Sequence, residues 1–185
     1  AIERGLVGSE MCIRDSSGSG KDGVEELLQQ SSAYIDQRSI DKKVYPKQIA
    51  FNSIPFVDCF LENNYTREEM KMVWETHKIL DENISVNPTA VRVPVLVGHA
   101  ESIYIETEKE IDIELAKNCL NEFAGISVID DVEEVDFPTS FEHGHGTDDV
   151  YVGRIRKGLS KNNSLNLWVV ADNVRKGAAL NSIQI

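Results

Sequence analysis

Short strand-type and helix-type segments follow one another irregularly along this chain, and that pattern restricts its fold most. Runs of β-branched residues predict strands, and apolar residues three and four apart predict helices. Strands are predicted at 91–97, 102–106, 126–129, 150–156 and 165–170, and helices at 24–30, 66–80, 113–123 and 173–185. Because these segments lack the steady rhythm of parallel strand–helix–strand units, we predict an α+β fold. It is a mixed, largely antiparallel sheet with helices on one face.

Residues 1–16 differ from the remainder of the chain. They show no clear periodicity, and the stretch at 6–16 resembles a translated sequencing-adapter fragment. We therefore predict that residues 1–16 are a foreign or disordered leader and leave them out of the predicted fold. The remaining residues, 17–185, are enough for one packed domain but too few for two of ordinary size.

The net charge restricts the class of partner. A formal net charge of −12, from 31 acidic and 19 basic residues, repels nucleic acids, so we expect no nucleic-acid partner. A local basic pocket can still bind a small anion, because short-range contacts outweigh a screened global charge. No apolar run approaches the ~20 residues that cross a bilayer, and no charged-then-apolar signal pattern opens the chain. We therefore expect no membrane partner and a cytoplasmic location.

Cysteine and histidine positions give little support for a metal site. The three cysteines are Cys12, Cys59 and Cys119. Their spacing is not that of metal ligands, and Cys59 and Cys119 are best explained as reduced, small apolar residues. His143 and His145 lie close to Asp148 and Asp149, but a solvated acidic loop explains two such histidines more simply than a metal site does. We predict no bound metal.

The predicted helix at 66–80 has the clearest start signal in the chain. Thr66 can accept the backbone amide of Glu69 while the Glu69 side chain reaches back, which is a capping box. Glu68 and Lys71 are three residues apart on this helix and therefore share one face. From the helix pattern alone, an exposed intrahelical ion pair is the favoured explanation for these two residues.

Arg92 and His99 have chemistry that their surroundings do not explain. An unpaired guanidinium in an apolar strand is costly to bury, so Arg92 needs a carboxylate from the protein or from a ligand. On a straight strand the two residues would be about 23 Å apart, at roughly 3.3 Å per residue, and on opposite faces. They can share a site only if the chain bends, and Pro94 and Gly98 can provide the bend. A structural turn histidine is the simpler alternative for His99.

Several stretches together resemble the aspartate-semialdehyde dehydrogenase family, in order and at fitting spacings from Ser17 to Ile185. Residues 65–80 resemble its substrate-binding helix, Arg92-Val93-Pro94-Val95 with Gly98-His99 its catalytic strand and turn, 166–179 its C-terminal strand and helix, and 17–21 its glycine-rich segment. The resemblance implies a glyceraldehyde-3-phosphate-dehydrogenase-like C-terminal domain that binds substrate and forms a homodimer. It also implies that the helix from residue 173 returns to a nucleotide-binding domain that this chain lacks.

The resemblance implies a reaction and a role for each matching residue. L-aspartyl 4-phosphate is reduced to L-aspartate 4-semialdehyde with NADPH, through a cysteine thioester, in lysine, threonine and methionine biosynthesis. His99 would be the acid–base, and Arg92, Glu68 and Lys71 would bind the α-carboxylate, the α-ammonium and the phosphate of the substrate. The positions implied for the cofactor are Ser17, Gly18, Gly20 and Asn173.

The departures from the family pattern keep two other functions open. The nucleophilic cysteine of the family lies upstream of the glycine-rich segment, in an Asn-Cys context, and nothing here corresponds to it. Arg14 stands where the substrate-orienting glutamine of the family is expected. The chain is therefore predicted to be inactive alone. A non-catalytic dimerisation module is one alternative. The other is a related acyl-phosphate reductase, such as N-acetylglutamyl-phosphate reductase, although Glu68 disfavours a substrate whose amine is acetylated and uncharged.

Overall fold

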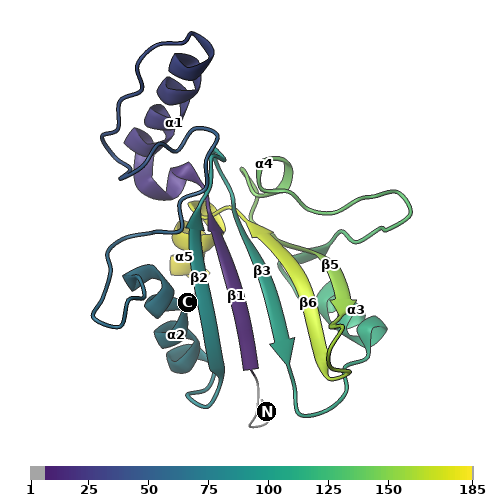
Figure 1. The fold of residues 1–185 in the computed structure, drawn as a ribbon. Coiled ribbons are helices and arrows are strands. Elements are labelled where there is room, and N and C mark those ends of the chain that lie inside the picture. The colour runs from purple at the N-terminus through teal and green to yellow at the C-terminus, as the bar shows by residue number, and fades with distance from the viewer. Residues whose placement is uncertain (1–6, 185) are drawn as a thin grey trace.

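The structure, a computed structural model, describes residues 7–184, and within them six strands form one mixed sheet in the order β2-β1-β3-β6-β5-β4 (Figure 1). The strands are β1 (Val7–Arg14), β2 (Ser85–Arg92), β3 (His99–Glu106), β4 (Ile126–Val128), β5 (Val150–Lys157) and β6 (Ser164–Ala171). The pairs β1–β2 and β4–β5 are parallel, and β1–β3, β3–β6 and β5–β6 are antiparallel. The predicted mixed, largely antiparallel sheet is confirmed.

Helices lie between and beside the strands. They are η1 (Ser16–Ser19), α1 (Gly20–Ile35), α2 (Arg67–Ile79), α3 (Ile113–Glu122), α4 (Ser140–His143), the π-helix η2 (Arg175–Leu180) and α5 (Asn181–Gln184). The capping box of α2 is present, with the Glu69 amide 3.2 Å from Thr66 Oγ1 and the Thr66 amide 2.7 Å from Glu69 Oε2. Over residues 7–184, none of these helices combines the length and apolar character needed to cross a membrane.

The helices α2 and α3 cover the same face of the sheet. Met72 of α2 packs with Cys12 of β1, and apolar residues of α3 pack against the cluster that includes Leu167 of β6. Cys12 of β1 lies opposite Glu101 of β3, which lies opposite Val169 of β6, so these three residues point to one face of the sheet. Leu167 is two residues from Val169 on β6 and therefore points to the same face. Figure 1 shows both helices behind the sheet, as the predicted one-sided arrangement requires.

The structure differs from the prediction for the leader, because residues 7–14 form β1, between β2 and β3. The backbone of this segment pairs with both neighbours, and Cys12 is fully buried. Sequence periodicity missed the strand because Glu10 and Arg14 lie on its helix-covered face and hide the alternation of apolar and polar residues. Residues 1–6 lie outside the described residues. The resemblance of 6–16 to an adapter fragment, and the domain boundary at Ser17, stay predictions.

Three other boundaries also differ. The strand predicted at 91–97 is observed as β2 at 85–92, and it contains Pro88, whose missing amide proton is tolerated on an edge strand. The helix α1 extends to Ile35, through residues predicted as loop. The C-terminal helix is a π-helix followed by one short α-helix, and Ile185 lies outside the described residues.

A candidate active site at the turn between two strands

The connection at 93–98 brings Arg92 and His99 together. Arg92 ends β2 and His99 begins β3, so the chain reverses between them instead of running straight. Gly98 has a φ of 90°, and a side chain there would collide with the backbone carbonyl of Ser140. Only glycine meets both conditions easily, and the bend that the sequence permitted is therefore built at Gly98.

Arg92 and His99 converge on Gly18 in the glycine-rich segment. A Cβ atom placed on Gly18 would be 2.9 Å from Arg92 Nη1 and 2.9 Å from His99 Cε1. Both side chains therefore lie against the backbone of a segment that is more than seventy residues away in sequence. The convergence of Arg92 and His99 that the sequence left open is therefore present in the structure, and their roles stay predictions.

Asp15 links these two residues and was not predicted from the sequence. Its side chain is fully buried, and its Oδ2 lies 2.5 Å from His99 Nδ1. Its Oδ1 accepts the Ser17 amide at 2.6 Å, and its backbone carbonyl accepts Arg92 Nη1 at 2.5 Å. Burial by itself would raise the pKa of Asp15, but the hydrogen bonds with His99 and Ser17 outweigh it and hold that pKa below its usual value.

Arg92 is buried but bonds to a carbonyl group instead of the expected carboxylate. Its relative exposure is 8%, and burial lowers its pKa, while the nearby Tyr45 and Asp15 act in the opposite direction. Arginine keeps its charge in proteins, so the site retains a cation. A buried guanidinium held by a neutral carbonyl can still gain from an anionic ligand.

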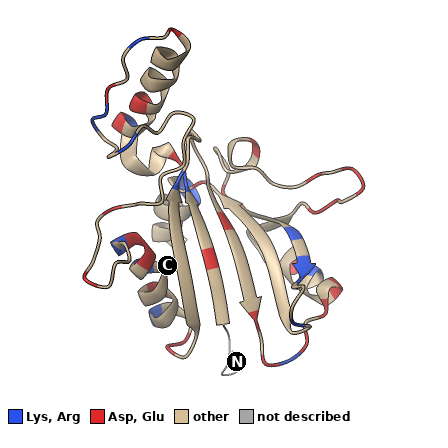
Figure 2. Ribbon diagram, in the orientation of Figure 1, with Lys and Arg blue, Asp and Glu red and all other residues tan. Residues whose placement is uncertain are grey.

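Glu68 is held by two cations from different elements. Its Oε1 lies 3.0 Å from Arg14 Nη2 on β1, and its Oε2 lies 3.1 Å from Lys71 Nζ on α2. Figure 2 shows basic residues at the end of β1 and β2 that lies beside α1. The intrahelical ion pair predicted between Glu68 and Lys71 is present. Arg14 and Lys71 therefore neutralise the Glu68 carboxylate within the protein. Arg14 stands at the position where the resemblance implies a glutamine.

The predicted cofactor positions lie at the same end of the sheet. The Ser17 hydroxyl and the Asn173 amide are hydrogen-bonded, with Asn173 Nδ2 3.0 Å from Ser17 Oγ. Asp172 was missed in the sequence. Its buried carboxylate accepts the backbone amides of Gly146, Val174 and Arg175, and so fixes the backbone that carries Asn173. An aspartate just before a helix start is the signal that could have found it.

Among residues 7–184, which the structure describes, one group of side chains could hold a metal ion. It consists of Glu10, Cys12 and Glu101, whose possible ligand atoms lie within 4.8 Å of one another. Burial, and then the charge of Glu101, raise the pKa of Glu10 to about 7. Burial likewise raises the pKa of Cys12, so its thiol lacks the environment that makes a cysteine nucleophilic. The ring of His143 accepts the Thr139 amide at 3.1 Å and packs at a tilt against Tyr151, with ring centroids 5.4 Å apart. These contacts give His143 a structural role.

Comparisons with known proteins place the chain in a family. The family model described as "Semialdehyde dehydrogenase, dimerisation domain" matches residues 11–176. The aspartate-semialdehyde dehydrogenase of Shewanella violacea is 55% identical over 170 residues, which cover 91% of this chain and 50% of the relative. That of Aquifex aeolicus is 47% identical over 186 residues, covering 100% and 54%. The chain thus spans about half the length of these relatives.

A solved structure agrees with this assignment. The aspartate semialdehyde dehydrogenase II of Vibrio cholerae, complexed with ASA, superimposes with a TM-score of 0.92 and 45% identity, over 96% of this chain and 52% of that one. The glyceraldehyde-3-phosphate-dehydrogenase-like C-terminal fold implied by the resemblance is confirmed. The turn with Arg92 and His99, the glycine-rich segment and the dimerisation-domain match all lead to one conclusion: the chain belongs to the semialdehyde dehydrogenase family, as a dimerisation domain whose relatives are aspartate-semialdehyde dehydrogenases.

Proposed function

We propose that this chain is the substrate-binding and dimerisation half of an enzyme that reduces L-aspartyl 4-phosphate to L-aspartate 4-semialdehyde. The observation that supports it most is the convergence of Arg92 and His99 on Gly18. A buried guanidinium and an imidazole on one glycine backbone give an anion-binding group next to a proton-transfer group. A member of this family needs both groups at one reacting centre.

Each side chain has a role that its position supports. His99 exchanges a proton with the reacting group, since an imidazole suits proton transfer near neutral pH. Arg92 holds the substrate α-carboxylate through its planar fork, and Lys71, half exposed on α2, meets the phosphate as a point charge. Glu68 pairs with the α-ammonium, which requires that Arg14 release it or be replaced.

The glycine-rich segment fits the nicotinamide end of a dinucleotide. Gly18 and Gly20 are both exposed, and a Cβ atom at Gly20 would meet nothing within 4 Å. The Ser17–Asn173 pair lies beside this surface and offers polar groups to a ligand. We infer that NADPH binds here and supplies the hydride, while these residues bind and orient it. The remainder of the cofactor belongs to a nucleotide-binding domain.

We further propose that the active enzyme is a homodimer, assembled through the sheet of this domain, and that it works in the cytoplasm. The nucleophile of the family precedes the glycine-rich segment, whereas Cys59 and Cys119 follow it, although Asn118 stands before Cys119. Cys12 is buried, and burial raises the pKa of its thiol. We therefore expect that the chain alone transfers no hydride. The lack of a counterpart to the nucleophile in this sequence also favours the second candidate function, a dimerisation module without catalysis.

A chimaera tests the proposal. Residues 17–185 replace the matching residues of the Shewanella violacea relative, which supplies everything else. We expect thiol-dependent reduction of NADP with aspartate semialdehyde and phosphate, and we expect His99→Ala to lower turnover about 10²–10⁴-fold. His77→Ala is the matched control, because His77 lies on α2 and bonds to the Ile84 carbonyl. A folded, dimeric chimaera without turnover would support the non-catalytic module, and unchanged turnover in His99→Ala would make His99 a turn residue.

A further inference from the structure

We propose that Asp15 is a positioning residue for His99: it accepts the proton of His99 Nδ1 and so leaves Nε2 as the free, basic nitrogen beside Gly18. The catalytic meaning of this contact rests on the proposed function, but the contact itself does not. Because Asp15 lies in the segment at 6–16 that resembles an adapter fragment, the inference is made for this chain and is not extended to its relatives.

The Asp15 carboxylate cannot easily turn away from His99. It is fully buried, and it holds His99 Nδ1 with one oxygen, at 2.5 Å, and the Ser17 amide with the other, at 2.6 Å. The backbone carbonyl of the same residue accepts Arg92 Nη1. One residue therefore fixes the positions of both groups that converge on Gly18.

The protonation states follow from the partners. An ionised carboxylate only accepts hydrogen bonds, so the nitrogen facing Asp15 must carry the proton. In a neutral imidazole the other nitrogen is then an acceptor, and the hydrogen bond of one nitrogen decides the tautomer of the ring. The lowered pKa of Asp15 agrees with an ionised carboxylate at neutral pH.

The free nitrogen faces the glycine-rich segment. A Cβ atom on Gly18 would be 2.9 Å from His99 Cε1 and 3.4 Å from His99 Nε2, so this edge of the ring borders the segment. The imidazole is mostly enclosed, with 15% of its side-chain surface exposed. Asp15 thus aims the acceptor nitrogen at the place where a ligand on Gly18 would lie.

The test is the tautomer of His99, measured in the whole 185-residue chain. Long-range proton–nitrogen correlation spectra of ¹⁵N-histidine-labelled protein report which ring nitrogen carries the proton. The pH is set to about 9, above the usual imidazole range, and His99→Ala assigns the signals. We expect Nδ1–H to be preferred by at least about tenfold, as a hydrogen bond to a charged group allows.

Asp15→Asn separates positioning from a structural role. If the asparagine oxygen keeps the Ser17 amide, its NH₂ group faces His99 Nδ1, which must then accept, so the preferred tautomer changes to Nε2–H. Asp112→Asn is the matched control, because Asp112 also caps a helix, at the Leu115 amide, but lies beyond the opposite end of β3 from His99. It should leave the tautomer unchanged.

Two results would overturn the inference. One is the Nε2–H tautomer in the unmodified chain, which needs no variant and so does not depend on whether Asp15→Asn folds. The other is an unchanged tautomer in a folded Asp15→Asn chain, as shown by its circular dichroism. Neither result depends on turnover, so the failure of this inference is distinguishable from the failure of the proposed function.

Discussion

Replacing Glu10 by glutamine should stabilise the chain at alkaline pH and have little effect at acidic pH. Glu10 lies on β1, two residues from Cys12, and Cys12 lies opposite Glu101 on β3. The carboxylates of Glu10 and Glu101 therefore share the helix-covered face, and Figure 2 shows acidic residues within both strands. Burial, and then Glu101, raise the pKa of Glu10, because both disfavour its charged form.

The sign of the effect follows from this shift. The pKa of Glu10 is about 7 in the folded chain, against an ordinary value of 4.5. The folded state therefore holds a proton that the unfolded state has lost, and its stabilising contribution is complete below the ordinary value and lost as pH rises through 7. A shift of this size corresponds to at most about 3 kcal/mol, and about 1–3 kcal/mol is expected because Glu10 is partly solvated.

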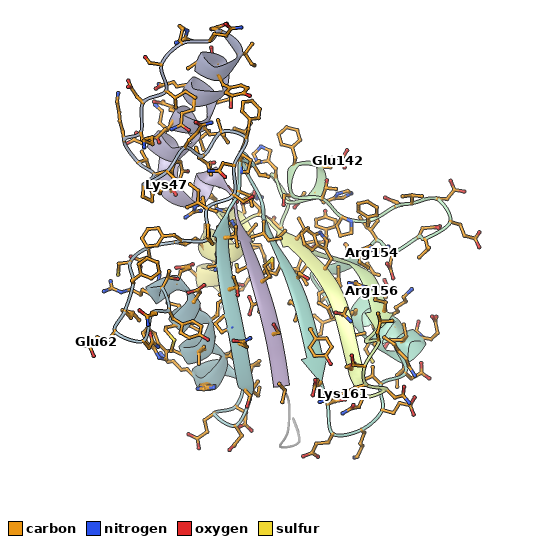
Figure 3. The ribbon with its side chains drawn as sticks, in the orientation of Figure 1. Lys47, Glu62, Glu142, Arg154, Arg156 and Lys161 are labelled. Carbon is orange, nitrogen blue, oxygen red and sulfur yellow. The ribbon has the colours of Figure 1, made fainter. Side chains whose placement is uncertain are left out.

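Urea unfolding at about pH 5 and about pH 8 measures the effect through the free energy of unfolding. Glu10→Gln keeps the shape of the side chain but has no charge to desolvate, so it should gain about 1–3 kcal/mol at pH 8 and much less at pH 5. Glu62→Gln is the control, since Glu62 points into solvent (Figure 3), and its effect should stay within about 0.5 kcal/mol at both pH values. An equal effect of Glu10→Gln at both pH values would refute the argument.

Three further predictions concern the site and the assembly. In a chimaera that carries residues 11–185, Arg14→Gln should release Glu68 and lower the KM for aspartate semialdehyde roughly fivefold; an unchanged KM would mean that Arg14 does not compete with the substrate. In the chimaera of residues 17–185, Arg92→Lys should weaken substrate binding in both reaction directions, whereas Lys71→Ala should mainly raise the phosphate requirement. Identical kinetic profiles of these two variants would contradict the division of roles. Sedimentation equilibrium of the chain should show a dimer, with an interface of roughly 2,000 Å² or more, and a single 20.7 kDa species would count against it.

Local signals in the sequence predicted the elements that depend on local chemistry. The capping box at Thr66 and Glu69 placed the start of α2 correctly, because both partners lie within one helical turn. The helix α3 was predicted at nearly its observed bounds, since its apolar spacing points to the cluster that it covers.

The elements that depend on distant partners were predicted poorly. Val93, Pro94 and Val95 have the composition of a strand, but the turn that joins Arg92 to His99 takes them out of the sheet. The strand β1 has a half-buried carboxylate at Glu10, which no pattern of alternation predicts, and only its pairing with β2 and β3 makes it a strand. Asp15 was missed for the same reason, because its partner His99 is 84 residues away.

The central claim is that this chain forms the substrate half of an aspartate-semialdehyde dehydrogenase, and substrate selectivity tests it most directly. The measurement is kcat/KM of the chimaera of residues 17–185 for aspartate semialdehyde and for N-acetylglutamate semialdehyde, with NADP and phosphate. Because an acetylated amine carries no charge with which Glu68 can pair, aspartate semialdehyde should be preferred by about 10²-fold or more. Equal values, or a preference for the acetylated substrate, in a folded and dimeric chimaera would contradict the account.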